Sequence, residues 1–351
     1  MSRESAVAAE SGPGMQAPNE ALIQIEGLVK HFPIRSGLLQ RQIGAVQAVD
    51  GVDLTLHSHE TLGLVGESGC GKSTLARLIL RLEKATAGKV LFRGVNIYDM
   101  SRRELLDFRR QVQVIFQDPY SSLNPRMTVE QIVGEGWRVH RSVAPRKQWK
   151  ARVKELLEQV GLDPQYSSRY PHEFSGGQRQ RIGIARALAL KPQVIICDEP
   201  VSALDVSIQA QVVNLLRQLQ RDLGLAYVFI AHDLSVVRQI ADRVAVMYLG
   251  KVAEIGNEEE IYEQPTHPYT QALLSAIPDP DPRMHGQRVR ILLQGDLPSP
   301  ANPPSGCRFR TRCWKAQPLC AEEVPALTDR FGHGHPSACH FAELKSLVEG
   351  R

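Results

Sequence analysis

Short apolar runs alternate with helical patterns along most of the chain. Two of the runs, 22–29 and 51–57, alternate apolar and polar positions as half-exposed strands do. Five others are more continuously apolar, which is typical of buried parallel strands: 61–65, 112–116, 194–197, 226–231 and 243–249. Helical patterns fall at about 72–82, 147–160, 178–190, 207–222 and 235–242. The repeated order of strand and helix predicts an α/β layered domain.

This pattern is interrupted twice. Residues 118–174 carry helical segments and no convincing strand, which predicts a helical subdomain. After about residue 263 the chain becomes rich in proline, as in GDLPSPANPPSGC, and proline disfavours regular elements. We therefore expect a domain over 21–262 and a small Cys/Pro-rich C-terminal domain over 263–351. Residues 1–20 are small and polar without the apolar core of a secretory signal, and we expect a disordered leader.

Composition excludes two classes of protein. The net charge of +4 in 351 residues is a weak bias, and no dense run of Lys and Arg indicates a nucleic-acid partner. No stretch of eighteen apolar residues occurs, so the chain is not expected to cross a membrane by itself. We expect it to act from the cytoplasm.

The segment GESGCGKST (66–74) fits the phosphate-loop pattern G-x-x-x-x-G-K-[ST] between a predicted strand and a predicted helix. Glycines let backbone N–H groups wrap a phosphate chain, and the helix N-terminus favours negative charge. Lys72 would reach the outer phosphates, and the Ser73 hydroxyl would bind Mg²⁺. The nucleotide contacts expected from this loop are Gly66, Ser68, Gly69, Cys70, Gly71, Lys72, Ser73 and Thr74.

Two further strands end in groups that could serve a phosphoryl transfer. VIICDEP (194–200) ends in two carboxylates, of which Asp198 could hold the magnesium and Glu199 could act as general base on a water molecule. A third group, His232 in AHD, follows the strand 226–231 and could contact the γ-phosphate. Taken alone, each of these would more simply be a solvated acid or a structural histidine.

A second phosphate-binding surface is predicted at FSGGQ. Ser175, Gly176, Gly177 and Gln178 lead into a helix whose free N–H groups and positive dipole end favour an anion. One chain has little use for two such surfaces on one nucleotide, whereas two chains facing each other can each cover the ATP of the other. The alternative is an ordinary glycine-led helix cap.

Together these motifs resemble those of an ABC-type ATPase, and they occur in that family's order. The resemblance implies Walker A, signature, Walker B, D-loop and H-loop motifs, with Asp205 in the D-loop SALD. It also identifies VIFQDPYSSLNPRMTV (114–129) as similar to a Q-loop, so that Gln117 would link the magnesium site to the helical subdomain. Phe32 is placed like the family's adenine-stacking aromatic, and a core phenylalanine is the alternative.

The resemblance extends over about 21–351 to one subfamily. RSGLLQRQIGAVQAVDGVDL, THPYTQALLSAIPDPDP and PSPANPPSGCRFRTRC are similar to the ATP-binding subunits of bacterial dipeptide/oligopeptide importers, and to the second of their two paralogous subunits. This implies an ATPase on the cytoplasmic face of the inner membrane. Its implied partners are a paralogous ATPase subunit, two membrane permease subunits and, indirectly, an external peptide-binding protein. Nickel and glutathione importers share the pattern, and a soluble non-transport ABC ATPase or a metal-sensing regulator is a further alternative.

Four of the six cysteines, Cys307, Cys313, Cys320 and Cys339, gather in the proline-rich extension. Spacings of five, six and eighteen intervening residues fit zinc poorly, and a reducing compartment disfavours disulfides. An iron–sulfur cluster takes four thiolates and tolerates loose spacing. Three arginines around the first two of these cysteines could offset its negative charge: Arg308, Arg310 and Arg312. The resemblance also implies a [4Fe-4S] cluster here, with zinc or no metal as alternatives, whereas Cys70 and Cys197 are expected to be inert.

Overall fold

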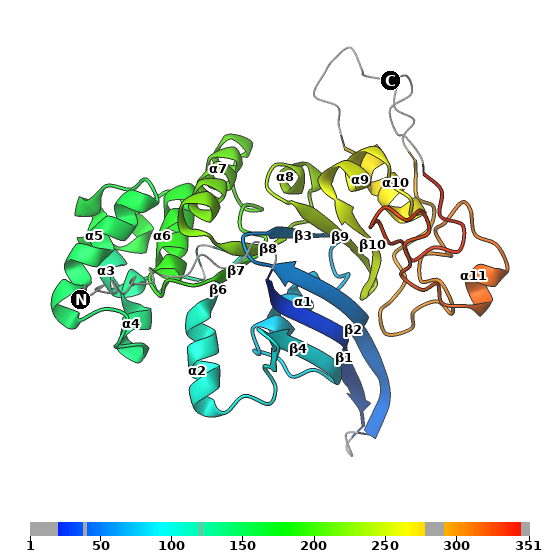
Figure 1. Cartoon of the computed structure of the whole chain (residues 1–351), viewed down its shortest axis with the longest axis horizontal. Helices are drawn as coiled ribbons and strands as arrows, with labels where there is room; N and C mark the ends of the chain where they lie inside the picture. The colour runs from blue at the N-terminus through cyan, green and yellow to red at the C-terminus, as the bar shows by residue number, and fades with distance from the viewer. Residues whose placement is uncertain (1–19, 38–40, 119, 121, 278–290, 345–351) are drawn as a thin grey trace, which may run out of the picture.

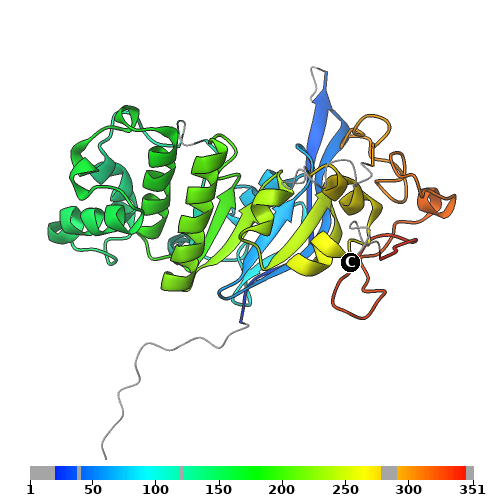
Figure 2. The ribbon, with the colours of Figure 1, turned by 90° about the horizontal axis from the view of Figure 1, so that it is seen from above.

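The computed structural model describes residues 20–37, 41–118, 120, 122–277 and 291–344. All but the last residue of the expected leader, and residues 278–290 and 345–351 of the C-terminal extension, lie outside the described residues. Figures 1 and 2 show the chain drawn out along one axis, with the segment 118–174 at one end and the C-terminal segment at the other.

The centre of the molecule is a six-stranded sheet in the order β10-β9-β3-β8-β7-β6. The strands are β3 (Thr61–Val65), β6 (Val112–Ile115), β7 (Val194–Asp198), β8 (Ala226–Ile230), β9 (Arg243–Tyr248) and β10 (Lys251–Asn257). The five continuously apolar runs form its parallel strands, as predicted, and β10 adds an antiparallel edge that the sequence pattern did not reveal. Parallel strands place their carboxyl ends at one edge, where the site residues follow them.

Alternate residues of each central strand face two separate cores. On β7, Ile195 and Cys197 belong to one core, whereas Val194 and Ile196 belong to the other. All four side chains are fully buried, which explains why such a strand reads as one continuous apolar run. The first core is covered by α6 (Gly176–Leu188), α7 (Val206–Leu223) and α8 (Leu234–Arg238), and α1 (Lys72–Ile79) covers the second.

A second, antiparallel sheet closes over α1 in the order β2-β1-β4-β5 (Figure 1). The two predicted half-exposed strands are much longer than their alternating patterns, since they continue as a hairpin over β1 (Ala21–Ser36) and β2 (Arg41–His57). Three short elements escaped the sequence pattern, namely β4 (Ala87–Phe92), β5 (Val95–Asn96) and α2 (Arg102–Gln111). Only Phe108 of α2 is buried and Leu105 is half-buried, so the apolar face of this ten-residue helix is short.

The segment 118–174 is helical, as expected, and its described residues contain no strand. It holds α3 (Val129–Val133), α4 (Glu135–Val139) and α5 (Trp149–Gln159), with 3-10 turns at Arg146–Gln148, Pro164–Ser168 and Pro171–Glu173. The buried Trp137 ties it to the main domain, because its Nε1–H donates to the Ala189 carbonyl at 2.7 Å.

The expectation that prolines exclude regular elements after residue 263 is wrong for α10 (Pro268–Ser275). Pro268 occupies the first turn of that helix, where no backbone N–H is needed and the fixed φ suits the helix. Before it lies α9 (Glu258–Glu263), and α11 (Leu319–Glu322) follows in the segment 291–344. That segment packs against the main domain through Phe309, which is 2% exposed and lies against Tyr248 and Tyr269.

Candidate functional site

The phosphate loop follows β3 and leads directly into α1, as the sequence predicts. Gly71 has a φ of 112°, and a Cβ built on it would lie 2.1 Å from the carbonyl oxygen of Ala48. Only glycine fits that position without moving the backbone. The loop backbone therefore lies directly against β2 at this position.

Lys72 is buried, and its ammonium group lies folded against the loop. The Nζ donates to the carbonyls of Gly66 at 2.7 Å and Glu67 at 3.1 Å. These contacts hold the cation within the loop's curve, where backbone N–H groups and the α1 dipole already favour phosphate. Burial raises the pKa of the neighbouring Cys70 thiol, which agrees with the expectation that this side chain is inert.

Ser73 and Asp198 meet across the site. The Ser73 hydroxyl donates to Asp198 Oδ1 at 3.0 Å, which joins the first turn of α1 to the end of β7. Burial raises the pKa of Asp198, the adjacent Glu199 raises it further, and the Ser73 hydrogen bond opposes both. A hydroxyl and a carboxylate in contact are the oxygen donors that Mg²⁺ prefers, so this pair fits the predicted magnesium site.

Glu199 lies between Gln117 and His232. Its Oε2 accepts a hydrogen bond from Gln117 Nε2 at 2.9 Å and lies 3.5 Å from His232 Nδ1. The Glu199 backbone has a φ of 47°, a region that non-glycine residues rarely adopt, and its N–H donates to the Ile230 carbonyl at 3.0 Å. The structure thus brings together three residues that are far apart in the sequence and that were predicted separately.

The turn Ser175–Gln178 begins α6 with a capping box. Ser175 Oγ accepts from the Gln178 N–H at 3.3 Å, and Gln178 Oε1 accepts from the Ser175 N–H at 3.0 Å. In Figure 1, α6 lies on the far side of β7 and β8 from α1. The turn therefore lies on a different side of the sheet from the helix that follows the phosphate loop of its own chain. Asp205 forms the N-cap of α7 close to this turn, where Ile208 of α7 packs on Gly177.

Phe32 lies on the hairpin beside the phosphate loop. It pairs with Val46 of β2, two residues before Ala48, which contacts Gly71. The ring is half-buried, and Lys30 Nζ lies 4.7 Å from its centroid. A partly open face near the loop suits base stacking better than a fully buried core position does.

The four C-terminal cysteines lie around one cavity. Cys307, Cys313, Cys320 and Cys339 line one small cavity with Phe309, Lys315 and His340, and all four are free thiols. Burial raises the pKa of the Cys339 thiol to about 11. Within the described residues, no three His, Cys, Asp or Glu side chains are grouped closely enough to hold a single metal ion.

All three arginines near these cysteines have other partners, which corrects the sequence expectation, since Arg310 also donates to the Ser305 carbonyl at 2.9 Å. Arg308 is buried and donates to Gln47 Oε1 and Asp50 Oδ2, each at 2.6 Å, and to the Leu249 carbonyl. Arg312 binds Glu67 of the phosphate loop. Arg310 lines the cysteine cavity. Sequence spacing placed all three near the thiols, but only the fold shows which way each side chain is directed.

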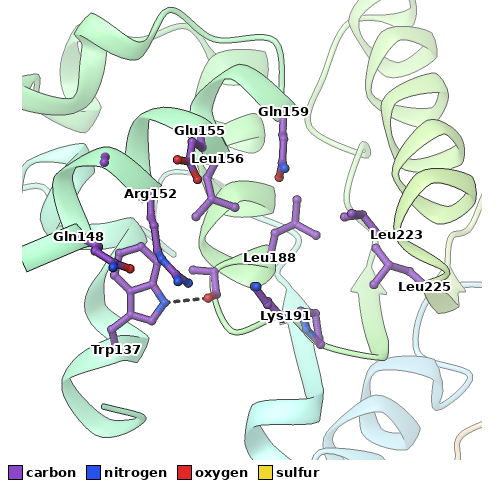
Figure 3. Close-up of a pocket in the computed structure, with 13 residues that line it drawn as sticks. Trp137, Gln148, Arg152, Glu155, Leu156, Gln159, Leu188, Lys191, Leu223 and Leu225 are labelled. Carbon is purple, nitrogen blue, oxygen red and sulfur yellow. Dashed lines mark hydrogen bonds between the residues drawn. The ribbon is translucent and has the colours of Figure 1, made fainter. Parts of the chain in front are cut away.

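A cavity of about 710 Å³ lies elsewhere, between α5 and the main domain (Figure 3). Its walls include Trp137, Leu156 and Leu188, with Leu223 and Leu225 from the segment before β8. Of the lining residues, Pro192 and Leu225 lie just before β7 and β8, at the sheet edge opposite the phosphate loop. The cavity is therefore separate from the nucleotide site.

Comparison with known proteins agrees with this geometry. Residues 49–202 match the ABC transporter family, and residues 253–320 match the C-terminal region of oligopeptide/dipeptide transporters. The chain is 54% identical to the oligopeptide transport ATP-binding protein AppF of Bacillus subtilis (strain 168), over 92% of this chain and 98% of that protein. The chain belongs to the ABC transporter ATP-binding proteins of the oligopeptide/dipeptide type.

Further relatives support the assignment of this ABC cassette. The oligopeptide transport ATP-binding protein OppF of Salmonella typhimurium is 55% identical over 90% of this chain and 95% of that protein. Among solved structures, a dimeric post-hydrolysis state of the cassette MJ0796 bound to ADP and Pi matches with a TM-score of 0.59 and 28% identity. That match covers 67% of this chain and 98% of MJ0796. In the described part of the chain, no helix is long and apolar enough to span a membrane.

Proposed function

We propose specific roles for the residues of this ATP-hydrolysing, energy-coupling subunit of an oligopeptide importer. The observation that carries the proposal is the meeting of Ser73 with Asp198 and of Gln117 and His232 with Glu199 at the carboxyl edge of one sheet. Since β3, β7 and β8 are parallel, their following residues converge where a nucleotide on the phosphate loop would present its phosphates.

Binding begins with the phosphate loop. Its N–H groups and the start of α1 hold the β- and γ-phosphates, and Lys72 exchanges its two carbonyl acceptors for phosphate oxygens. Ser73 and Asp198 would hold Mg²⁺, with Gln117 as a further oxygen donor, and the bound ion would supply positive charge beside the phosphates. Phe32 stacks on the adenine ring.

Glu199 acts as the general base in hydrolysis. Its carboxylate takes a proton from the water that attacks the γ-phosphorus, while His232 steadies the γ-phosphate. Gln117 donates to the same carboxylate and lies in the segment that leads into the helical subdomain, so it orients the base and connects it with that subdomain. The strained backbone of Glu199 fits a catalytic position, since strain of this kind is retained where function needs it.

Two cassettes act together in this mechanism. The turn Ser175–Gln178 covers the ATP of a facing cassette, and Asp205 lies at the interface between them. Support comes from the position of α6, which lies on the far side of β7 and β8 from α1 (Figure 1), and from the dimeric structure of the relative MJ0796. The facing cassette is a paralogous subunit rather than a copy of this chain. Closure of the pair drives two permease subunits, which hold this subunit at the cytoplasmic face of the membrane.

The central experiment replaces the base alone. Glu199→Gln keeps an oxygen that accepts from Gln117, so ATP binding should persist while phosphate release falls by about 10²-fold or more. Fluorescent-ATP titration and a phosphate-release assay on the complex with permeases separate the two steps. Glu155→Gln, an exposed glutamate of α5, is the matched control and should retain turnover. Phosphate release at the wild-type rate from Glu199→Gln would refute the role of Glu199.

We further propose that the region 263–351 forms a C-terminal domain and that its four thiols, which line one cavity, would hold a [4Fe-4S] cluster. Each thiolate binds a different iron in such a cluster, so the sulfurs stand farther apart than around one ion. This arrangement fits four thiols that share a cavity without forming a single-ion site. The cluster's contribution is structural, because peptide import needs no electron.

Anaerobic purification followed by iron and sulfide analysis tests the cluster. About four irons and four sulfides per chain are expected, with loss of both in Cys313→Ser. Colourless protein that holds zinc without sulfide, or no metal at all, would overturn the cluster and leave the ATPase assignment intact.

A further inference from the structure

The C-terminal segment reaches the phosphate loop through one ion pair. Arg312 donates to both carboxylate oxygens of Glu67, Nη1 to Oε2 at 2.7 Å and Nη2 to Oε1 at 3.1 Å. Glu67 is the second residue of the phosphate loop, and Arg312 follows it by 245 positions in the sequence. The two side chains are 10% and 27% exposed, so the pair is largely removed from solvent screening. A two-pronged contact of this type fixes direction as well as distance.

Each residue of this ion pair is also fixed by a hydrogen bond from its own backbone N–H. The Glu67 N–H donates to the Tyr269 hydroxyl at 2.9 Å, and Tyr269 is fully buried against Phe309 and Tyr248. The Arg312 N–H donates to the Phe309 carbonyl at 3.0 Å, in the turn that buries Phe309. The phosphate loop and the C-terminal segment therefore meet over one aromatic cluster, and neither can shift without disturbing the ion pair.

A second anchor holds the same segment to the main domain. Arg308 binds Gln47 and Asp50 of β2, on the strand that also supplies the carbonyl beside Gly71. The turn after β9 adds a backbone link, because the Gly250 N–H donates to the Cys70 carbonyl at 2.8 Å. Arg308 and Arg312 thus attach the segment on two sides of the phosphate loop.

Glu67 has an electrostatic cost for nucleotide binding. A carboxylate within the loop adds negative charge beside the site of a polyanionic triphosphate, and like charges in a partly buried site repel strongly. The paired Arg312 offsets that charge and keeps the carboxylate turned away toward the C-terminal segment. Removing the arginine would leave Glu67 unpaired next to the phosphates.

We propose that Arg312 is a positioning residue for ATP binding, which neutralises Glu67 and makes the phosphate loop's affinity depend on the docked C-terminal segment. The inference rests on the proposed nucleotide role of that loop. It gives the C-terminal segment a part in the ATPase cycle that is independent of any metal at the cysteines.

The test measures ATP affinity on the full chain by fluorescent-ATP titration. Arg312→Ala should weaken binding by about tenfold, within the range typical of coupled sites. Glu67→Gln should bind ATP at least as tightly as the wild type, and the double variant Glu67→Gln/Arg312→Ala should recover most of the lost affinity. The defect of Arg312→Ala should also shrink as salt is raised, because screening weakens the repulsion. Arg330→Ala, an exposed arginine of the same segment, is the control and should bind as the wild type does.

Three outcomes separate the possibilities. Wild-type affinity in Arg312→Ala, or no recovery in the double variant, overturns the inference. Should Arg312→Ala fail to fold, Arg312→Lys keeps the charge without the two-pronged geometry and should give a smaller loss that Glu67→Gln again relieves. Lys72→Ala serves as the reference. If this variant binds ATP normally, the proposed nucleotide site itself is wrong. If Lys72→Ala binds ATP weakly while Arg312→Ala binds it as the wild type does, only the role of Arg312 is refuted.

Discussion

Mild acid should loosen the C-terminal region through one buried histidine. His267 is 2% exposed and caps α10, with its Nδ1 accepting the Tyr269 N–H at 3.0 Å. A protonated ring could not accept that bond. Burial lowers the pKa of His267 from 6.5 to about 4, although the nearby Glu254 carboxylate favours the charged form. The unfolded chain therefore takes up a proton over a pH range in which the folded chain does not.

The sign and size of the effect follow from the two pKa values. Stability from the neutral ring is fully present above pH 6.5 and is lost as pH falls toward 4. The gap corresponds to about 3.4 kcal/mol in full, of which about 2 kcal/mol disappears between pH 7 and pH 5. Burial alone would raise the pKa of Glu254, but hydrogen bonds from His335 and Thr266 outweigh it and the pKa is lowered. Its own loss of stability therefore begins only below its usual value of 4.5, outside this window.

Urea unfolding at pH 7, 6 and 5, followed by tryptophan fluorescence, measures the effect. His267→Asn keeps an acceptor for the Tyr269 N–H but cannot titrate. Between pH 7 and pH 5 the free energy of unfolding of the wild type should therefore fall by about 2 kcal/mol more than that of His267→Asn. His333→Asn, at an exposed position, should behave as the wild type does. Equal pH dependence in the wild type and His267→Asn would show that the buried ring is not held neutral.

Three further predictions concern the nucleotide site. Lys72→Ala should lower ATP affinity by tenfold or more, because the only ammonium group within the described loop is lost; a fluorescent-ATP titration curve that matches the wild type would contradict this. Gly71→Ala should unfold or displace the phosphate loop, since the added Cβ meets the Ala48 carbonyl at 2.1 Å, and a normal melting temperature together with normal ATP binding would show that the loop can adapt. Ser175→Ala removes the acceptor of the Gln178 N–H and should cost about 1 kcal/mol of stability with slower turnover. Ser175→Thr is the control, and unchanged turnover in Ser175→Ala would argue against a catalytic role of the cap hydroxyl.

Local sequence patterns were sufficient to predict most residues of the proposed nucleotide site. The residues 66–74 act through backbone conformation, which glycine spacing reports directly, and Asp198 and Glu199 end a strand whose apolar run is unmistakable. Elements with little buried surface were harder to find. The apolar face of α2 is short, the two-residue strand β5 leaves no periodic signal, and Pro268 concealed a helix that it in fact begins.

The sequence by itself was sufficient to predict the parallel sheet and the phosphate loop, because both depend on short apolar runs and on the local spacing of glycines. The bounds of the helical subdomain and the four-cysteine site also come from local patterns, and they stay predictions. Only the tertiary structure decided which way side chains turn between segments far apart in the chain. Gln117 meets Glu199, and Arg312 meets Glu67 rather than the thiols beside it. Gln117 follows β6 and Glu199 follows β7, so their contact depends on the pairing of those two strands. The contact of Arg312 depends on how β9, α10 and the C-terminal segment pack around Tyr248, Tyr269 and Phe309. Pairing and packing between segments far apart in the chain leave no periodic pattern in the sequence.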